Sequence, residues 1–187
     1  MIDMLASDGS EDDWVRRAQA GDVKAFSELV CRHQKSVYRY LLRMLGSHDD
    51  AMELTQDAFI KAWQALPQWR PEAQFHTWLF RIANNTALDA LRHRKLIKFV
   101  PLEDSFDAPG SEPDPAHKAQ VTQEVRQLDA SLKKLMPEHR QILLLREVEE
   151  MSYEEIGCVL SLNEGTVKSR LARARAALIE IRARGRS

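Results

Sequence analysis

The 187-residue chain has few of the residues that build disulfide or metal sites. Its 2 cysteines, Cys31 and Cys158, are isolated in the sequence, so we expect reduced thiols on apolar helix faces and no disulfide. The 6 histidines are scattered, and none is spaced from a cysteine or carboxylate as metal ligands usually are. The sequence therefore predicts no metal site and no bound cofactor.

Glycine and proline are also scarce, with 7 of each, and they fall mainly at the boundaries of apolar segments. No segment keeps the period-two alternation of a strand, whereas apolar spacings of three and four residues recur. No apolar run is long enough to span a bilayer, and the acidic start MIDMLASDGSEDDW does not resemble a signal peptide. We expect an all-α cytoplasmic protein with no direct membrane insertion.

Catalytic motifs are missing as well. The sequence contains no phosphate-binding glycine loop, and no nucleophile, base and orienting group can be assembled from it. We therefore expect a protein that is not an enzyme. The formal net charge is −1, whereas affinity for DNA comes largely from Lys and Arg that neutralise phosphates. DNA binding by this chain would need local basic patches and help from a partner.

The most informative segment runs from Ser152 to Leu178 and predicts two helices with a sharp corner. Ser152 and Glu155 have the spacing of a capping box, and Asn163 can cap the second helix after a break at residues 161–163. Four apolar residues of the second helix recur at helical spacing: Val167, Leu171, Ala174 and Leu178. The remaining face carries cations, as in a helix-turn-helix whose second helix enters the major groove of DNA.

One detail of this segment departs from the usual pattern. Helix-turn-helix corners often carry a glycine, whereas Gly157 and Gly165 are expected inside the two helices. A solvated basic face on an ordinary helical hairpin is the alternative interpretation. The agreement of cap, corner and apolar spacing favours DNA binding over that alternative.

A second segment, residues 69–98, joins aromatic residues to cations. The aromatic residues gather in the entry loop and the first turns of a predicted helix: Trp69, Phe75, His76, Trp78 and Phe80. The cations follow near its end: Arg92, Arg94, Lys95 and Lys98. Aromatic rings can stack on unpaired bases, and cations placed beyond them can hold phosphates. Trp78 is expected in the core, whereas Trp69, Arg70 and Asn85 are expected to have a binding role.

The helical pattern divides the chain into two domains. Residues 11–99 form the first, with four expected helices: Asp12–Ala20, Asp22–Leu45, Ala51–Leu66 and Phe75–Lys98, and with a turn at Gly46–Asp50 between the second and third. Residues 100–119 hold four prolines and five carboxylates, which predicts a flexible acidic linker. Residues 120–184 form the second domain, where the run Ile142–Leu145 predicts a helix buried on most sides.

Three motifs in order carry a resemblance to a known family: LTQDAFIKAWQAL (54–66), FHTWLFRIANNTALDALR (75–92) and LMPEHRQILLLREVEEMSYEEIGCVLSLNEGTVKSRLARAR (135–175). The resemblance covers almost the whole chain: the chain resembles a group IV, extracytoplasmic-function sigma factor of the sigma-70 family. Members are promoter-specificity subunits of bacterial RNA polymerase. The resemblance implies region 2 at residues 11–99, a helical bundle, and region 4 at residues 120–184, which contains the helix-turn-helix.

The resemblance also implies roles for individual residues. The surface for the clamp helices of the polymerase β′ subunit would comprise Gln56, Asp57, Phe59, Lys61 and Trp63. Recognition of the −10 promoter element would involve Trp69, Arg70, Gln74, Phe75, Asn85 and Arg92. Recognition of the −35 element would involve Tyr153, Glu154, Thr166, Lys168, Ser169, Arg170 and Arg173. Ala172 and Asp89 depart from residues common in the family, which affects the expected base preference.

The expected partners are core RNA polymerase, through the clamp helices and the β flap, and promoter DNA. The family also implies a role in stress responses and an anti-sigma factor, which could be membrane-anchored. Opening a duplex costs about 1.4 kcal/mol per base step, so opening several steps costs more than one or two stacked aromatic rings return. We therefore expect the free protein to bind promoter DNA poorly.

Two other classes of protein stay open at this point. An autonomous helix-turn-helix regulator would use the same second helix, as a dimer on palindromic sites, but would leave the aromatic segment without a purpose. A helical adaptor that binds only protein would be insensitive to charge reversal at Lys168 and Arg173.

Overall fold

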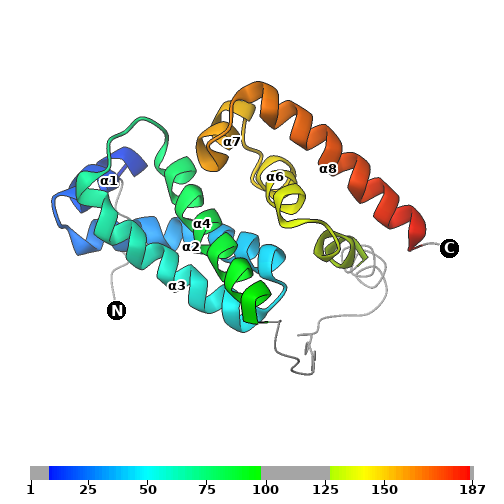
Figure 1. Cartoon of the computed structure of the whole chain (residues 1–187). Coiled ribbons are helices and arrows are strands. Elements are labelled where there is room, and N and C mark those ends of the chain that lie inside the picture. The colour runs from blue at the N-terminus through cyan, green and yellow to red at the C-terminus, as the bar shows by residue number, and fades with distance from the viewer. Residues whose placement is uncertain (1–8, 98–126, 186–187) are drawn as a thin grey trace, which may run out of the picture.

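The computed structural model describes residues 9–97 and 127–185, and within these ranges every regular element is a helix (Figure 1). The first group comprises α1 (Glu11–Gln19), α2 (Val23–Leu45), α3 (His48–Ala65), the short 3-10 helix η1 (Leu66–Gln68) and α4 (Phe75–Ile97). The second comprises a helical segment at 127–133, α6 (Pro137–Glu147), α7 (Tyr153–Leu160) and α8 (Glu164–Arg184). The all-α expectation is confirmed. The expected acidic linker, residues 100–119, lies outside the described residues.

The first group is a bundle in which α2, α3 and α4 pack on one another and α1 packs on α2 (Figure 1). The Asp22 carboxylate caps α2 by accepting from the backbone of Lys24 and Ala25, and α2 ends at Gly46, whose φ of 74° suits glycine. Tyr40 is fully buried, and its hydroxyl donates to Asn84 Oδ1 at 2.7 Å. Because a buried hydroxyl needs such a partner, this bond fixes α2 against α4.

The expected turn at Gly46–Asp50 is wrong in its second half, because α3 already begins at His48. The Ser47 hydroxyl accepts a hydrogen bond from the Asp50 backbone N–H at 3.3 Å and so caps the helix. Asp49 and Asp50 then lie in the first turn, where the helix dipole favours negative charge. Asp50 also forms an ion pair with Arg94, which joins the start of α3 to the end of α4.

The second group is built around α6, whose run Ile142–Leu145 is at most 4% exposed, as expected. The capping box is confirmed: Glu155 Oε2 accepts from the Ser152 backbone at 2.8 Å, and Ser152 Oγ accepts from the Glu155 backbone at 3.2 Å. Asn163 caps α8 through Thr166 N at 2.8 Å, also as expected. Val167 is among the residues through which α8 packs back on α6 and α7.

The corner between α7 and α8 depends on Gly157, although this residue lies inside α7. The chain bends back after Ser161, whose φ of 54° is left-handed, and Leu162 N donates to Gly157 O at 2.9 Å. A Cβ atom on Gly157 would lie 2.7 Å from Leu162 O, a backbone atom that cannot move away alone. The glycine of this helix-turn-helix is therefore present, but it acts one turn before the corner.

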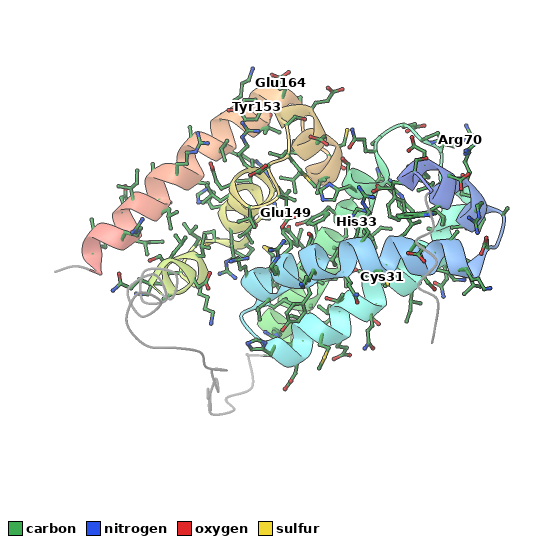
Figure 2. The ribbon with its side chains drawn as sticks, turned by 180° about the vertical axis from the view of Figure 1, so that it is seen from behind. Cys31, His33, Arg70, Glu149, Tyr153 and Glu164 are labelled. Carbon is green, nitrogen blue, oxygen red and sulfur yellow. The ribbon has the colours of Figure 1, made fainter. Side chains whose placement is uncertain are left out.

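The expectation that both cysteines lie on apolar helix faces is wrong, because Cys31 and Cys158 are exposed. Cys31 lies on the outer side of α2 (Figure 2). Cys158 lies on α7 between the buried residues Ile156 and Val159, which take the core-facing side of this short helix. Among the described helices, none is both long and apolar enough to cross a membrane.

Replacing Gly157 with alanine should destabilise the second group of helices. The overlap with Leu162 O should cost about 1–3 kcal/mol, which exceeds the gain of up to about 1 kcal/mol that alanine brings to a helix. Thermal unfolding followed by circular dichroism should show a lower Tm for Gly157→Ala. Gly165→Ala is the matched control, because its Cβ would be 3.6 Å from the nearest atom, Asn163 Oδ1. Equal Tm values for the two variants would contradict this account.

Two neighbouring histidines make stability depend on pH. Burial lowers the pKa of His33 below its ordinary value, although Glu11 Oε2, 3.3 Å from His33 Nε2, opposes this shift. Burial also lowers the pKa of His76, with His33 as the next cause. The folded state thus binds fewer protons than the unfolded state, so the free energy of unfolding should fall as pH drops from 7 through the unfolded value near 6.5.

Denaturant unfolding at several pH values between 7.5 and 5.5 measures this dependence. His76→Phe should reduce the slope, because the phenyl ring keeps the packing on Phe80 and cannot take up a proton. His93→Phe, at an exposed position of α4, is the matched control and should keep the wild-type slope. A wild-type protein whose stability is flat across this range would refute the assignment.

Candidate nucleic-acid and polymerase interfaces

The outward face of α8 carries the residues expected to read the −35 element. Lys168, Ser169 and Arg173 are exposed, whereas Arg170 and Thr166 are partly buried. The opposite face buries Val167 and Leu171, so the cations cannot turn inward. A helix held in this way presents its polar side chains outward, which is the geometry that a recognition helix needs in a major groove.

Tyr153 links α7 to the basic face. The Arg146 guanidinium carbon lies 5.1 Å from the centre of its ring, and Lys168 Nζ lies 5.7 Å from the same centre. Both distances lie within the range of cation–π attraction. Tyr153 and Glu164 lie together near the start of α8 (Figure 2). Tyr153 therefore positions Lys168, while its neighbour Glu154 stays exposed at the rim of the same face.

Carboxylates accompany two cations of this face. Glu164 Oε1 lies 2.6 Å from Lys168 Nζ, and this hydrogen bond raises the pKa of Lys168. Glu147 Oε1 lies 2.6 Å from an Arg175 nitrogen, which ties Arg175 back to the end of α6. Arg173, in contrast, is exposed and donates to Ser169 O at 3.4 Å. A phosphate or base edge would compete with Glu164 for the ammonium group of Lys168.

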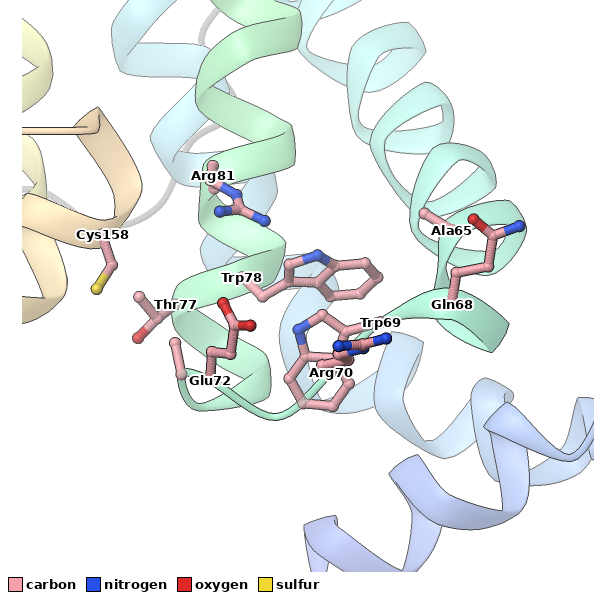
Figure 3. Close-up of a pocket in the computed structure, with 10 residues that line it drawn as sticks. Ala65, Gln68, Trp69, Arg70, Glu72, Thr77, Trp78, Arg81 and Cys158 are labelled. Carbon is pink, nitrogen blue, oxygen red and sulfur yellow. The ribbon is translucent and has the colours of Figure 1, made fainter.

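The second site is a pocket of about 340 Å³ at the loop that precedes α4 (Figure 3). Its lining comprises Ala65, Gln68, Trp69, Arg70, Glu72, Ala73, Thr77, Trp78, Arg81 and Cys158. The rings of Trp69 and Trp78 lie 5.3 Å apart, and both contact Phe75, at 6.2 and 5.6 Å. This cluster gives the pocket a rigid aromatic wall with two guanidinium groups at its edge.

The loop is held in place by α1. Gln19 Nε2 donates to Trp69 O at 2.8 Å and to Leu66 O at 3.3 Å, so one side chain fixes both ends of the segment between α3 and the pocket. These two hydrogen bonds fix the backbone at Trp69 and so position its ring at the pocket.

The six residues expected to read the −10 element do not all meet in this pocket. Trp69 and Arg70 line it, whereas Phe75 is 4% exposed and supports it from the core. Asn85 is exposed one helical turn beyond Arg81, on the same face of α4. Gln74 is exposed ahead of α4, outside the lining. Arg92 is exposed farther along α4 and is paired with Asp89 at 2.9 Å.

The residues expected to bind the polymerase lie on two sides of α3. Gln56 is exposed, and Asp57 is partly buried. Lys61 is exposed, with its Nζ 3.3 Å from Thr86 Oγ1 of α4. Phe59 is 7% exposed, and both it and Trp63 pack on Phe26, at 6.4 and 4.9 Å. Phe59 and Trp63 therefore support this face of the bundle from inside.

The outer side of α3 holds two residues that the sequence analysis missed. Met52 and Ile60 are 57% and 54% exposed, and with Gln56 they form a stripe at a spacing of four residues. Arg81 and Thr77 were also missed at the pocket. The sequence contained a signal for the stripe: Met52 and Ile60 are apolar, yet they do not fit the helical periodicity of the buried residues of α3. The contribution of Cys158 to the pocket had no local signal.

Comparison with known proteins identifies the family of the chain. Residues 29–97 match the Sigma-70 region 2 family, and residues 125–178 match Sigma-70, region 4. The ECF RNA polymerase sigma-E factor of Escherichia coli is 37% identical over 172 residues, which cover 88% of this chain and 90% of that protein.

Two solved structures share this fold over most of the chain. CnrH, solved with the cytosolic domain of CnrY, has a TM-score of 0.67 and 27% identity, with 90% of this chain and 94% of that chain covered. The sigma factor RpoE from Bartonella quintana, solved with the anti-sigma factor NepR, has a TM-score of 0.68 and 24% identity, with 85% and 97% covered. The sequence matches and this fold agree: the chain belongs to the extracytoplasmic-function RNA polymerase sigma factors.

Proposed function

We propose that this protein binds core RNA polymerase and directs it to promoters by contacting the −10 element through region 2 and the −35 element through region 4. The observation that supports this most is the presence of two DNA-compatible surfaces with different chemistry. The face of α8 suits a duplex groove, whereas the aromatic pocket beside α4 suits an unpaired base. An autonomous repressor would have use for only the first.

At the −35 element, α8 lies in the major groove with Lys168 and Arg173 toward the DNA. Ser169 and Thr166 add hydroxyl groups, and Arg170 and Tyr153 approach the groove edge. Because Glu164 competes for Lys168, part of the binding free energy is spent on separating that pair. Sequence preference at this element then rests mainly on Arg173, which is exposed and donates to Ser169 O of its own helix.

At the −10 element, a base turned out of the stack enters the pocket beside Trp69. Arg70 and Arg81 hold its phosphates, and Asn85 meets a neighbouring base edge from the same face of α4. Stacking of one base on the pocket contributes about 1–3 kcal/mol. Opening several base steps costs more than this, because each step costs about 1.4 kcal/mol. The opening therefore needs the contacts that core polymerase makes with the DNA.

The stripe Met52, Gln56 and Ile60 on α3 is the surface we assign to the polymerase clamp, with Asp57 and Lys61 at its edges. Exposed apolar residues among polar ones are typical of protein interfaces. Region 4 contacts the β flap through a separate surface. The protein acts by binding rather than by catalysis, and it works in the cytoplasm beside its polymerase.

We also propose control by an anti-sigma factor. RpoE from Bartonella quintana, which shares this fold, was solved with the anti-sigma factor NepR, and CnrH was solved with a domain of CnrY. Such a regulator would cover the surfaces that face the polymerase. A membrane anchor on it would connect this chain to a signal from outside the cell.

Transcription in vitro from a promoter library, with and without the protein, tests the proposed function. Core polymerase with the protein should give new start sites that share one −35 and one −10 motif, because each surface reads one element. Core polymerase alone should not use these sites. If the protein adds no start sites, yet binds duplex DNA tightly by itself as a dimer, the autonomous regulator is the better account.

Charge reversal on α8 tests the −35 surface separately. Arg173→Glu should lower initiation at these promoters by about 10- to 100-fold, because loss of one groove contact costs about 1–3 kcal/mol. Arg184→Glu is the matched control in the last turn of the same helix, where the side chain is 83% exposed, and it should keep wild-type activity. An equal effect of both changes would point to general charge rather than groove contact.

A further inference from the structure

Helix α1 lies ahead of residues 29–97, the part of the chain that matches Sigma-70 region 2. It packs not only on α2 but also on η1, the short helix that leads into the loop before α4. We propose that α1 braces the pocket beside α4, and that Gln19, its last residue, is the positioning residue that sets which base of the −10 element the Trp69 ring accepts. The inference rests on the proposed function and adds a determinant of specificity to the same site.

The loop that carries the pocket, residues 69–74, has no regular secondary structure. Its backbone bonds join near neighbours: Trp69 N donates to Leu66 O at 3.1 Å, and Glu72 N donates to Arg70 O at 2.8 Å. Pro71 fixes one further backbone angle. Such local bonds shape the loop, but they do not hold it against the rest of the bundle. Its position must therefore come from contacts with other helices.

Gln19 supplies a contact of this kind. Its side-chain amide is partly buried and donates to Trp69 O at 2.8 Å and to Leu66 O at 3.3 Å. The first acceptor directly follows η1 and the second lies at its start, so one amide group spans the segment between α3 and the loop. Because the stronger bond is made to the backbone of Trp69 itself, a shift of Gln19 moves the ring that forms the pocket wall.

The start of α1 is tied to the back of the same wall. Glu11 Oε2 lies 3.3 Å from His33 Nε2 on α2. The His33 residue is 7% exposed, and its ring centre lies 5.6 Å from that of Phe75, which supports the pocket from the core. The helix is thus fixed at its first turn against the wall whose outer ring Gln19 positions from the last turn.

Stacking alone cannot select a base, because every base has a face on which a ring can stack. Selection must come from the shape of the pocket: the rings of Trp69 and Trp78 lie 5.3 Å apart, and Arg70 follows Trp69 directly in the chain (Figure 3). A displacement of about 1 Å at a fitted site can cost a factor of about 100. Gln19 lies outside the pocket lining, so its effect on selection passes through the Trp69 backbone.

The first measurement follows the Trp69 ring in the full chain, without DNA or polymerase. Fluorotryptophan at the 4 tryptophan positions gives one fluorine resonance each, and Trp69→Phe identifies the resonance of interest. Gln19→Met keeps the side-chain length but removes the donor, so the Trp69 resonance should shift or broaden while that of Trp63 on α3 stays. Gln34→Met, at an exposed position of α2, is the matched control and should leave the spectrum unchanged.

The second measurement uses the holoenzyme on a promoter library that is randomised over the −10 element. Gln19→Met should lower the base preference about tenfold at the one position whose base enters the pocket, and it should leave the −35 preference unchanged. Gln19→Lys restores an N–H donor on a side chain of similar reach and should recover both the resonance and the preference. Gln34→Met should behave as the wild type in both measurements.

An unchanged Trp69 resonance in Gln19→Met would overturn the inference, and so would a changed resonance with an unchanged base preference. Equal loss of transcription from every promoter, at constant preference, would also overturn it, because Gln19 would then only stabilise the fold. If the wild-type holoenzyme starts no transcription from the library, the proposed function fails, while the fluorine spectra still decide whether Gln19 positions the ring.

Discussion

The buried guanidinium of Arg140 is the interaction on which the second half of the protein depends. Within residues 9–97 and 127–185 it has no carboxylate partner, and it donates to the carbonyl oxygens of Leu132, Lys133 and Leu135 as well as to Met44 O. Burial lowers the pKa of Arg140, yet an arginine stays charged at any physiological pH. A buried cation is tolerated only when several dipoles point at it, so these four carbonyl groups must keep their places. The Arg140 side chain thus holds the turn before α6 and also joins region 4 to the end of α2 in region 2.

The local distribution of charge explains how a chain with net charge −1 can bind DNA. Its cations are concentrated on α8, and carboxylates accompany two of them: Glu164 pairs with Lys168, and Glu147 pairs with Arg175. These exposed pairs contribute little to stability, since ion pairs in water are weak. Their effect is on DNA binding, because phosphates must compete with carboxylates already in place. Under the proposed function, contacts from polymerase supply the rest of the binding free energy.

Local signals in the sequence predicted much of the fold. The capping box at Ser152, the cap at Asn163 and the buried run Ile142–Leu145 all follow from neighbours within four residues, and the structure has them. What could not be predicted depends on distant residues. Phe59 and Trp63 point inward because Phe26 of α2 lies there, and Cys158 reaches the pocket because region 4 docks on α4. No periodicity within one helix contains that information.

The contact between the regions combines polar bonds with an apolar core that runs through both groups of helices. Each core is apolar, with side chains such as Leu41 and Ile142 fully buried, and buried apolar area resists separation in water. Three polar bonds also join the regions: Arg140 with a carbonyl, Thr77 with Glu155 and Arg43 with Asp129. A typical hydrogen bond contributes only about 0.5–1.5 kcal/mol net, because water replaces it when it breaks. These bonds therefore add little stability of their own, and what they chiefly do is fix the register in which the apolar surfaces of the two regions meet.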